Sequence, residues 1–197
     1  NGTAQTYGTH SVPVDHHAEY LIELGKAWSL DPHRPVWLQE VGAPAPHIPA
    51  DHAAAFARAT VENALDCPDL WGVTWWCSHD VDRALADFPQ LEYSLGLLTN
   101  DGAVKPAGRE ISHIVQEVRD TWTPAAPRST GLVLDLPEHA RKRSTCAPGG
   151  AYFEAFMNLT AQGARPAVVL AELAGDAAHL AGRGVTDIVT VEAATIS

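Results

Sequence analysis

The sequence has 197 residues, of which 46% are hydrophobic and 19% charged, as in an ordinary globular protein. A chain of this length can form one large domain or two small ones. Its net charge of −11 and pI of about 5.2 argue against nucleic acid or an anionic membrane as the main partner, because both attract basic surfaces. No apolar run reaches the roughly 20 residues of a membrane span. The three cysteines are widely spaced and suggest no disulfide framework, so we expect a cytoplasmic protein.

The first 122 residues alternate between strand-like and helix-like segments. The expected elements are a strand at 3–9, a helix at 15–29, a strand at 35–40, a helix after Asp51, a strand at 70–77 and a helix from Lys105. Such alternation predicts parallel strands covered by helices. Three units are too few for a complete TIM barrel, which needs about 250 residues. Residues 1–122 are therefore predicted to be the C-terminal part of a (β/α)8 barrel.

A second alternation follows the proline-containing segment 123–129, which we interpret as a linker. Residues 130–197 are predicted to form a partial doubly wound α/β domain. Its expected elements are strands at 131–136, 166–171 and 186–191, with helices at 149–161 and 176–181. The chain begins without a methionine and ends in a strand-like segment, 189–197. We expect it to be a piece of a longer polypeptide.

Glu40 follows the apolar run Val36–Leu38 and precedes Val41–Gly42, which would let the backbone turn sharply out of the barrel. An isolated glutamate at a strand end is most often a surface or ion-paired residue. In a TIM barrel, however, the C-terminal ends of the strands carry the catalytic groups. A carboxylate there can attack an anomeric carbon or act as the base for a water molecule. Glu40 is therefore the predicted catalytic residue if the barrel forms.

Two indoles, Trp75 and Trp76, end the next predicted strand. Because side chains alternate along a strand, one should line the mouth of the barrel and the other should pack against helices. Either one could also be a core residue. Trp76 lies nearer the strand end, so it is the predicted sugar-stacking residue, with Trp75 as a second candidate.

Polar residues leave the same strand end. His79 and Asp80 are predicted to contact sugar hydroxyls, although ordinary loop polarity explains them equally well. His10 could reach the same mouth, with a structural histidine as the alternative. Cys77 and His79 alone do not make a metal site, which needs three or four ligands, so we expect no metal. The segment Cys146–Gly150 lacks the glycine spacing of a dinucleotide fingerprint, and no cofactor is predicted.

These motifs resemble the retaining β-glycosidases of the large barrel clan, most closely glycoside hydrolase family five. The turn Gln39–Gly42 is similar to the family's seventh strand, where a nucleophilic glutamate precedes a hydrophobic residue and a glycine. The segment Gly72–Trp76 is similar to the eighth strand, whose closing tryptophan floors the sugar site. Tyr93–Leu98, with the turn and Lys105-Pro106 after it, resembles the exit into the last helix. His10–Pro13 matches the sixth-strand motif only loosely.

The resemblance covers about residues 1–122 and implies retaining hydrolysis of β-mannosides or related β-1,4-linked oligosaccharides. By this resemblance Glu40 would be the nucleophile, and Trp76 would stack on the sugar at the floor of the binding site. The family's acid/base glutamate follows an asparagine on the fourth strand, and this sequence has no such segment. Since retaining chemistry needs two carboxyl groups about 5–5.5 Å apart, these residues alone should be inactive. Some clan members carry a flavodoxin-like, oligomer-forming domain after the barrel, which implies that residues 130–197 assemble a homo-oligomer and bind no cofactor.

Two other interpretations remain open. The first is a non-catalytic carbohydrate-binding or scaffold barrel that has lost its acid/base residue. The second is a nucleotide-binding α/β protein, which the doubly wound segment suggests.

Overall fold

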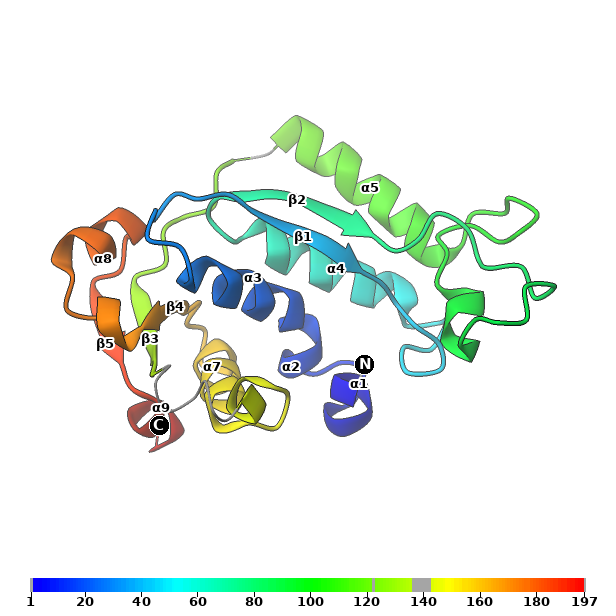
Figure 1. Cartoon of the computed structure of the whole chain (residues 1–197). Helices are drawn as coiled ribbons and strands as arrows, with labels where there is room; N and C mark the ends of the chain where they lie inside the picture. Colours follow the sequence, from blue (N-terminus) through cyan, green and yellow to red (C-terminus); the bar gives the residue numbers. More distant parts are fainter. Residues whose placement is uncertain (1, 122, 136–142, 197) are drawn as a thin grey trace. The chain divides into compact units, whose positions relative to one another are not determined.

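The computed structural model describes residues 2–121, 123–135 and 143–196, and its packing divides the chain into two compact units (Figure 1). Unit 1 contains the residues up to Ala18, Trp37–Leu65 and Gly72–Pro124. Unit 2 contains Glu19–Val36, Asp66–Trp71 and the residues from Ala125 onward. Packing thus groups two short segments of the first 122 residues with the C-terminal region. The predicted domain limits, 1–122, 123–129 and 130–197, follow chain order and stay a prediction.

The chain begins with three helices, α1 (Gly2–Tyr7), α2 (Val12–Asp15) and α3 (His17–Ala27). The strand predicted at 3–9 is therefore wrong. Its threonines and tyrosine favour strands, but such preferences are weak compared with tertiary packing. Ala4 is buried in a cluster with Val14, Ile48 and Phe56, and a helix brings it there.

Strands β1 (Val36–Val41) and β2 (Leu70–Trp75) are joined through helix α4 (Ala53–Leu65). The Val36 N–H donates to the Asp69 carbonyl (3.0 Å) and the Trp76 N–H donates to the Val41 carbonyl (2.7 Å). The first bond joins the N-terminal ends of the two strands and the second joins their C-terminal ends. The strands are therefore parallel, as Figure 1 shows. Their C-terminal ends therefore meet at the same edge of the sheet.

Helix α4 packs against α5 (Pro106–Thr121), the last helix of unit 1. Helical spacing in the sequence predicts that Ala57, Val61, Ala64 and Leu65 face inward on α4. Ala57 and Ala64 are buried, whereas Val61 and Leu65 are half-buried. On α5 the buried residues are Ala107 and Ile114. The same spacing predicts a buried face of α5 that includes Val115 and Trp122, yet Val115 is 52% exposed. The predicted inward residue Trp122 lies outside the described residues.

Unit 2 contains a parallel sheet of β3 (Thr130–Leu134), β4 (Ala167–Leu170) and β5 (Asp187–Val189), in the order β4-β3-β5. Helix α7 (Ala151–Ala161) precedes β4, and α8 (Ala177–Arg183) precedes β5. Because the second crossover reverses direction, right-handed connections place these helices on opposite faces. This is the start of a doubly wound sheet, as predicted.

The segment from 189 onward was expected to be a strand, but the structure has helix α9 (Val191–Ile196) there. The Thr190 carbonyl accepts from Ala194 N–H (3.0 Å), and its hydroxyl accepts from Ala193 N–H (3.4 Å). Ala194 is buried, at 2% exposed. Capping by Thr190 and burial of one helix face override the β-branched residues. In the part of the chain that the structure describes, the remaining elements are three short 3-10 helices: η1 (Gln90–Ser94), η2 (Arg143–Cys146) and η3 (Ala171–Leu173).

Helix α7 supplies the aromatic core of unit 2. Helical spacing in the sequence predicts that four residues face inward, and all four are buried: Tyr152, Phe153, Phe156 and Leu159. Tyr20 of α3 meets Phe153 and Phe156 edge to face, at 5.2 Å and 5.0 Å between ring centroids. Each fully buried phenylalanine contributes about 1.5–3 kcal/mol relative to an exposed one.

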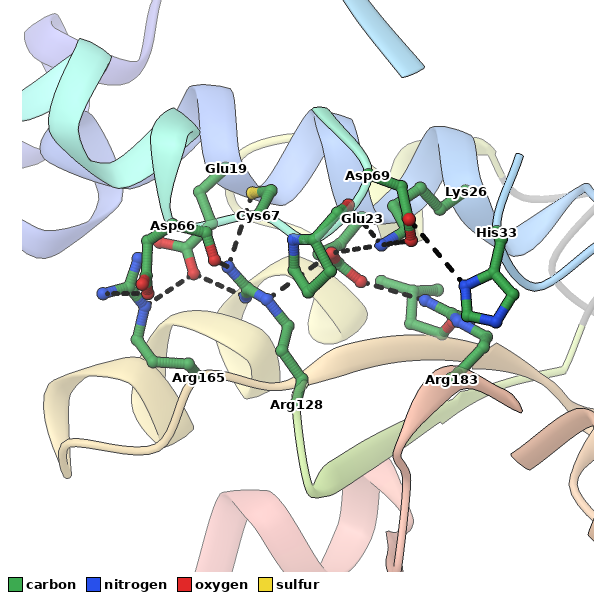
Figure 2. Close-up of polar contacts among 12 residues, drawn as sticks. Glu19, Glu23, Lys26, His33, Asp66, Cys67, Asp69, Arg128, Arg165 and Arg183 are labelled. Carbon is green, nitrogen blue, oxygen red and sulfur yellow. Dashed lines mark hydrogen bonds and ion pairs between the residues drawn. The ribbon is translucent and has the colours of Figure 1, made fainter. Parts of the chain in front are cut away.

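An arginine cluster lies beside this core: Glu19, Glu23, Arg128, Arg165 and Arg183. Figure 2 shows the guanidinium groups directed at the two carboxylates of α3. Arg128 and Arg165 donate to Glu19 (2.5 Å and 2.7 Å), and Arg183 donates to Glu23 (3.0 Å). Arg128 comes from the segment expected to be a linker, yet it is only 4% exposed.

Candidate active site

Glu40 lies near the C-terminal end of β1, as predicted from the sequence. Leu38 is buried, whereas Gln39 and Glu40 are both exposed, so the alternation along the strand is interrupted at this point. Among the described residues none forms a hydrogen bond or ion pair with the Glu40 carboxylate. Its oxygens are therefore open to a ligand.

Gly42 brings the end of β1 against the backbone of Trp76. A Cβ atom at Gly42 would lie 2.6 Å from the Trp76 carbonyl oxygen and 3.4 Å from a methyl group of Leu95. The sequence pattern predicts a sharp turn at this glycine. The structure gives a different reason, a close approach of two backbone segments that leaves no space for a side chain.

Trp75 ends β2 and Trp76 follows it, and the two indoles have different surroundings. Trp75 packs edge to face against Phe56 of α4, with 6.4 Å between ring centroids, and belongs to the apolar cluster of unit 1. Trp76 is 46% exposed, and its peptide bond to Cys77 is cis. This difference favours a core role for Trp75 and keeps Trp76 available for stacking.

A third indole, which sequence reasoning did not select, lies near the same strands. The Trp37 Nε1–H donates to the Thr74 hydroxyl (3.0 Å), and its ring lies 3.7 Å from the Cβ position of Gly72. Trp37, Gly72 and Thr74 therefore share one face of the sheet. Trp76 follows Trp75, the last residue of β2, and its indole is exposed.

Asp80 is held within the loop that follows β2. Its Oδ1 accepts from the Lys105 ammonium (2.7 Å) and from the Gly96 N–H (2.9 Å). Lys105 also donates to the Ser94 carbonyl (2.8 Å). These contacts give Asp80 a structural role in the loop.

His79 is exposed, and its Nδ1 lies 3.3 Å from the Ser78 hydroxyl.

His10 does not end a strand, because it follows α1. Its ring lies 4.4 Å from the ring of His52, which in turn contacts the Thr9 hydroxyl at 3.0 Å. The structure thus shows a histidine pair at this position. A sugar contact by His10 stays a prediction.

Glu92, a residue of η1, contacts the candidate stacking residue. The Trp76 Nε1–H donates to Glu92 Oε2 at 3.3 Å. Burial raises the pKa of the nearby Cys77 thiol, and the negative charges of Glu92 and Asp80 raise it further. No local sequence pattern distinguishes Glu92, because its contact joins positions 16 residues apart.

A cavity of about 180 Å³ lies on the Trp75 side of unit 1. Its lining is mostly apolar and includes Ile48, Trp75, Leu95 and Pro106, with Lys105 at one wall. The proline-rich loop 43–50 contributes to this cavity. Glu40 and Trp76 are not among its lining residues.

The part of the chain that the structure describes has no group of three or more His, Cys, Asp or Glu side chains placed to hold a metal ion. Within the same residues, no helix has the length and apolar character needed to cross a membrane.

The fold and the strand ends together define the C-terminal part of a (β/α)8 barrel followed by the start of a doubly wound α/β region, in agreement with the solved structures that this chain matches. No protein-family model and no curated protein matches the chain.

Two solved structures are similar over 98% of the chain. A GH5_18 variant from Streptomyces cattleya in complex with Manβ1-4GlcNAc is 63% identical, with a TM-score of 0.94. A GH5_18 variant from Bifidobacterium longum subsp. longum, also in complex with Manβ1-4GlcNAc, is 43% identical, with a TM-score of 0.90. The chain covers 47% and 46% of those proteins, so it spans about half their length. The resemblance to glycoside hydrolase family five is confirmed over this span.

An exo-β-1,4-mannosidase from Opitutaceae bacterium strain TAV5 is 18% identical over 81% of the chain, with a TM-score of 0.57. At this identity the likeness concerns the fold alone.

Proposed function

We propose that this chain carries the nucleophile half of a retaining β-glycosidase that acts on β-mannosides such as Manβ1-4GlcNAc. The proposal rests on the exposed carboxylate of Glu40, which has no partner among the described residues and lies near the end of a parallel strand. The two residues that follow it, Val41 and Gly42, lie against the backbone of the exposed Trp76. The GH5_18 proteins that share 63% and 43% identity with the chain were crystallised with this disaccharide, which supports the choice of sugar.

In this mechanism a Glu40 oxygen attacks the anomeric carbon of the mannosyl unit. The bond to the leaving sugar oxygen breaks, and an acid residue outside this chain protonates that oxygen. The resulting glycosyl-enzyme ester is then hydrolysed by a water molecule that the same outside residue deprotonates. Trp76 would stack on the sugar ring and hold the anomeric carbon within reach of Glu40.

The test is Glu40→Gln in the full-length protein, assayed on an aryl β-mannoside. We expect kcat to fall by about 10⁴-fold or more, because the amide cannot form the covalent intermediate. The matched control is Glu172→Gln, an exposed glutamate in η3 of unit 2, which should leave kcat unchanged. Hydrolysis close to the wild-type rate in Glu40→Gln would contradict the assignment. A wild-type protein that binds the disaccharide without hydrolysing it would favour the carbohydrate-binding alternative.

A homo-oligomer built through the C-terminal region and a cytoplasmic location also belong to the proposal. The first rests on the resemblance of residues 130–197 to an oligomer-forming domain. The second rests on the spacing of the cysteines. Analytical ultracentrifugation and fractionation of the source cells would test them.

A further inference from the structure

Glu92 occupies an unusual position for a carboxylate in unit 1. One oxygen accepts the indole hydrogen of Trp76 at 3.3 Å, and the residue is half-buried. Within the described chain, no lysine, arginine or histidine forms an ion pair with it. Asp80, the other carboxylate near Cys77, is instead neutralised by Lys105 at 2.7 Å.

The segment that carries Glu92 is fixed at its end and beside it. The Ser94 carbonyl, at the end of η1, accepts from the Lys105 ammonium that also binds Asp80. The Tyr93 hydroxyl donates to the Leu85 carbonyl (2.5 Å), and the Arg83 guanidinium lies 5.0 Å from the centre of the Tyr93 ring. Glu92 is therefore held in place by its neighbours before any ligand binds, and preorganised groups lose less entropy on binding.

The chemistry of this arrangement suits a polyol. A carboxylate accepts several hydrogen bonds through two oxygens, and among the described residues only Trp76 donates a hydrogen bond to the Glu92 carboxylate. The exposed indole offers an apolar face for a pyranose ring, whose hydroxyl groups lie at the ring edge. A hydroxyl of such a ring can donate to the free oxygen of Glu92.

We infer that Glu92 is a sugar-contacting residue: it orients the Trp76 indole through Oε2 and accepts a hydrogen bond from a hydroxyl of the stacked mannoside. The inference rests on the proposed function for the identity of the sugar. Asp80 is a positioning residue: it binds Lys105, which in turn holds η1 and with it Glu92.

The first experiment measures the contact without any catalysis. The NMR resonance of the Trp76 indole N–H is assigned in the full-length protein with Trp76→Phe, and then compared in Glu92→Gln and Glu92→Ala. We expect the resonance to move in both variants, and furthest in Glu92→Ala, because the hydrogen bond to a carboxylate is lost. The control Glu172→Gln should leave it in place. An unmoved resonance in Glu92→Ala would overturn the indole contact.

The second experiment measures sugar binding in an inactive background. The dissociation constant of the mannose-containing disaccharide is measured by calorimetry in Glu40→Gln and in Glu40→Gln/Glu92→Gln. We expect the second change to weaken binding about tenfold, the typical effect of a hydrogen bond to a charged group. Equal dissociation constants would overturn the sugar contact, whatever the indole resonance shows.

In the active protein, Glu92→Gln should raise KM about tenfold and change kcat by less than about twofold, because the contact is made equally in ground state and transition state. A fall in kcat alone, with KM unchanged, would contradict a binding role. Absence of hydrolysis in the wild-type protein would refute the proposed function, whereas the calorimetric comparison would still decide on Glu92.

Discussion

Two regions of this molecule use glutamates in opposite ways. In unit 2, Glu19 and Glu23 are fully buried and held by three arginines (Figure 2). In unit 1, Glu40 is exposed and unpaired within the described chain, and Glu92 is half-buried with an indole as its partner. Burying an unpaired carboxylate is very costly, so a buried one must be paired. A carboxylate that stays near water can remain free to react or to bind.

The pairing in the arginine cluster joins distant parts of the sequence. Arg128 and Glu19 are 109 positions apart, and Arg165 and Glu19 are 146 apart. Arg128 also donates to the Asp66 carbonyl at 3.3 Å, while Lys26 donates to the Pro68 carbonyl at 2.7 Å. The cluster therefore fixes the short segment that enters β2, and we assign it a structural role.

The largest effect on stability is expected from Arg128→Met. The change leaves the buried Glu19 and Glu23 with less compensating charge, and breaking a buried ion pair costs about 3–5 kcal/mol. Urea unfolding of the full-length protein would measure it, with the exposed Arg119→Met of α5 as the control. A loss below about 1 kcal/mol, the level of a surface ion pair, would remove the contrast between the two regions.

The next effect is expected from Gly42→Ala. The added Cβ would meet the Trp76 carbonyl at 2.6 Å, and overpacking of this kind costs about 1–3 kcal/mol. Relieving this overlap would move the end of β1 away from Trp76 and so separate Glu40 from the indole. We therefore expect a larger relative fall in kcat/KM than in the free energy of unfolding. Gly175→Ala is the matched control, since no atom lies within 4 Å of its Cβ position. Equal activity in both variants would show that the close approach is irrelevant to the site.

A smaller effect is expected from Lys105→Met. It removes the cation from Asp80, whose side chain is 15% exposed, and releases the Ser94 carbonyl. After allowance for solvent screening, we expect a loss of about 1–2 kcal/mol in the free energy of unfolding. As the control, Asp87→Asn at an exposed position should leave the free energy of unfolding unchanged. If η1 is held mainly through this lysine, the Trp76 indole resonance should also broaden, and a sharp, unmoved resonance would contradict that role.

The smallest effect concerns Glu117 on the exposed surface of α5. Hydrogen bonds from Arg58 hold the pKa of this carboxyl below its usual value. Its folded-state pKa is therefore lower than its unfolded-state pKa. The contribution of Glu117 to the free energy of unfolding is present above its unfolded-state pKa and is lost as the pH falls through its folded-state pKa. Unfolding of wild type and Glu117→Gln at neutral and acidic pH would reveal the difference. A constant difference across that range would contradict the linkage.

Much of the local structure could be predicted from the sequence. The apolar runs before Glu40 and Trp76 predicted β1 and β2 within a residue or two of their observed limits. The helical spacing of Tyr152, Phe153 and Phe156 predicted the buried face of α7. In these segments a periodic apolar pattern coincides with burial, so local and tertiary preferences agree.

Other features depend on contacts that no local pattern encodes. Helix α1 forms where threonines favour a strand, because Ala4 is buried against α2 and α4. The burial of Arg128 follows from glutamates more than a hundred positions away. Glu92 becomes a candidate site residue only through its hydrogen bond from the Trp76 indole, which the sequence does not reveal.

The role of Glu40 as nucleophile is tested most sharply by covalent labelling of the full-length protein with a fluorinated β-mannoside that traps the glycosyl-enzyme. Peptide mapping by mass spectrometry then locates the sugar. We expect a single labelled peptide with the mannosyl group on Glu40. A label on any other carboxylate, or turnover without a covalent adduct, would contradict it.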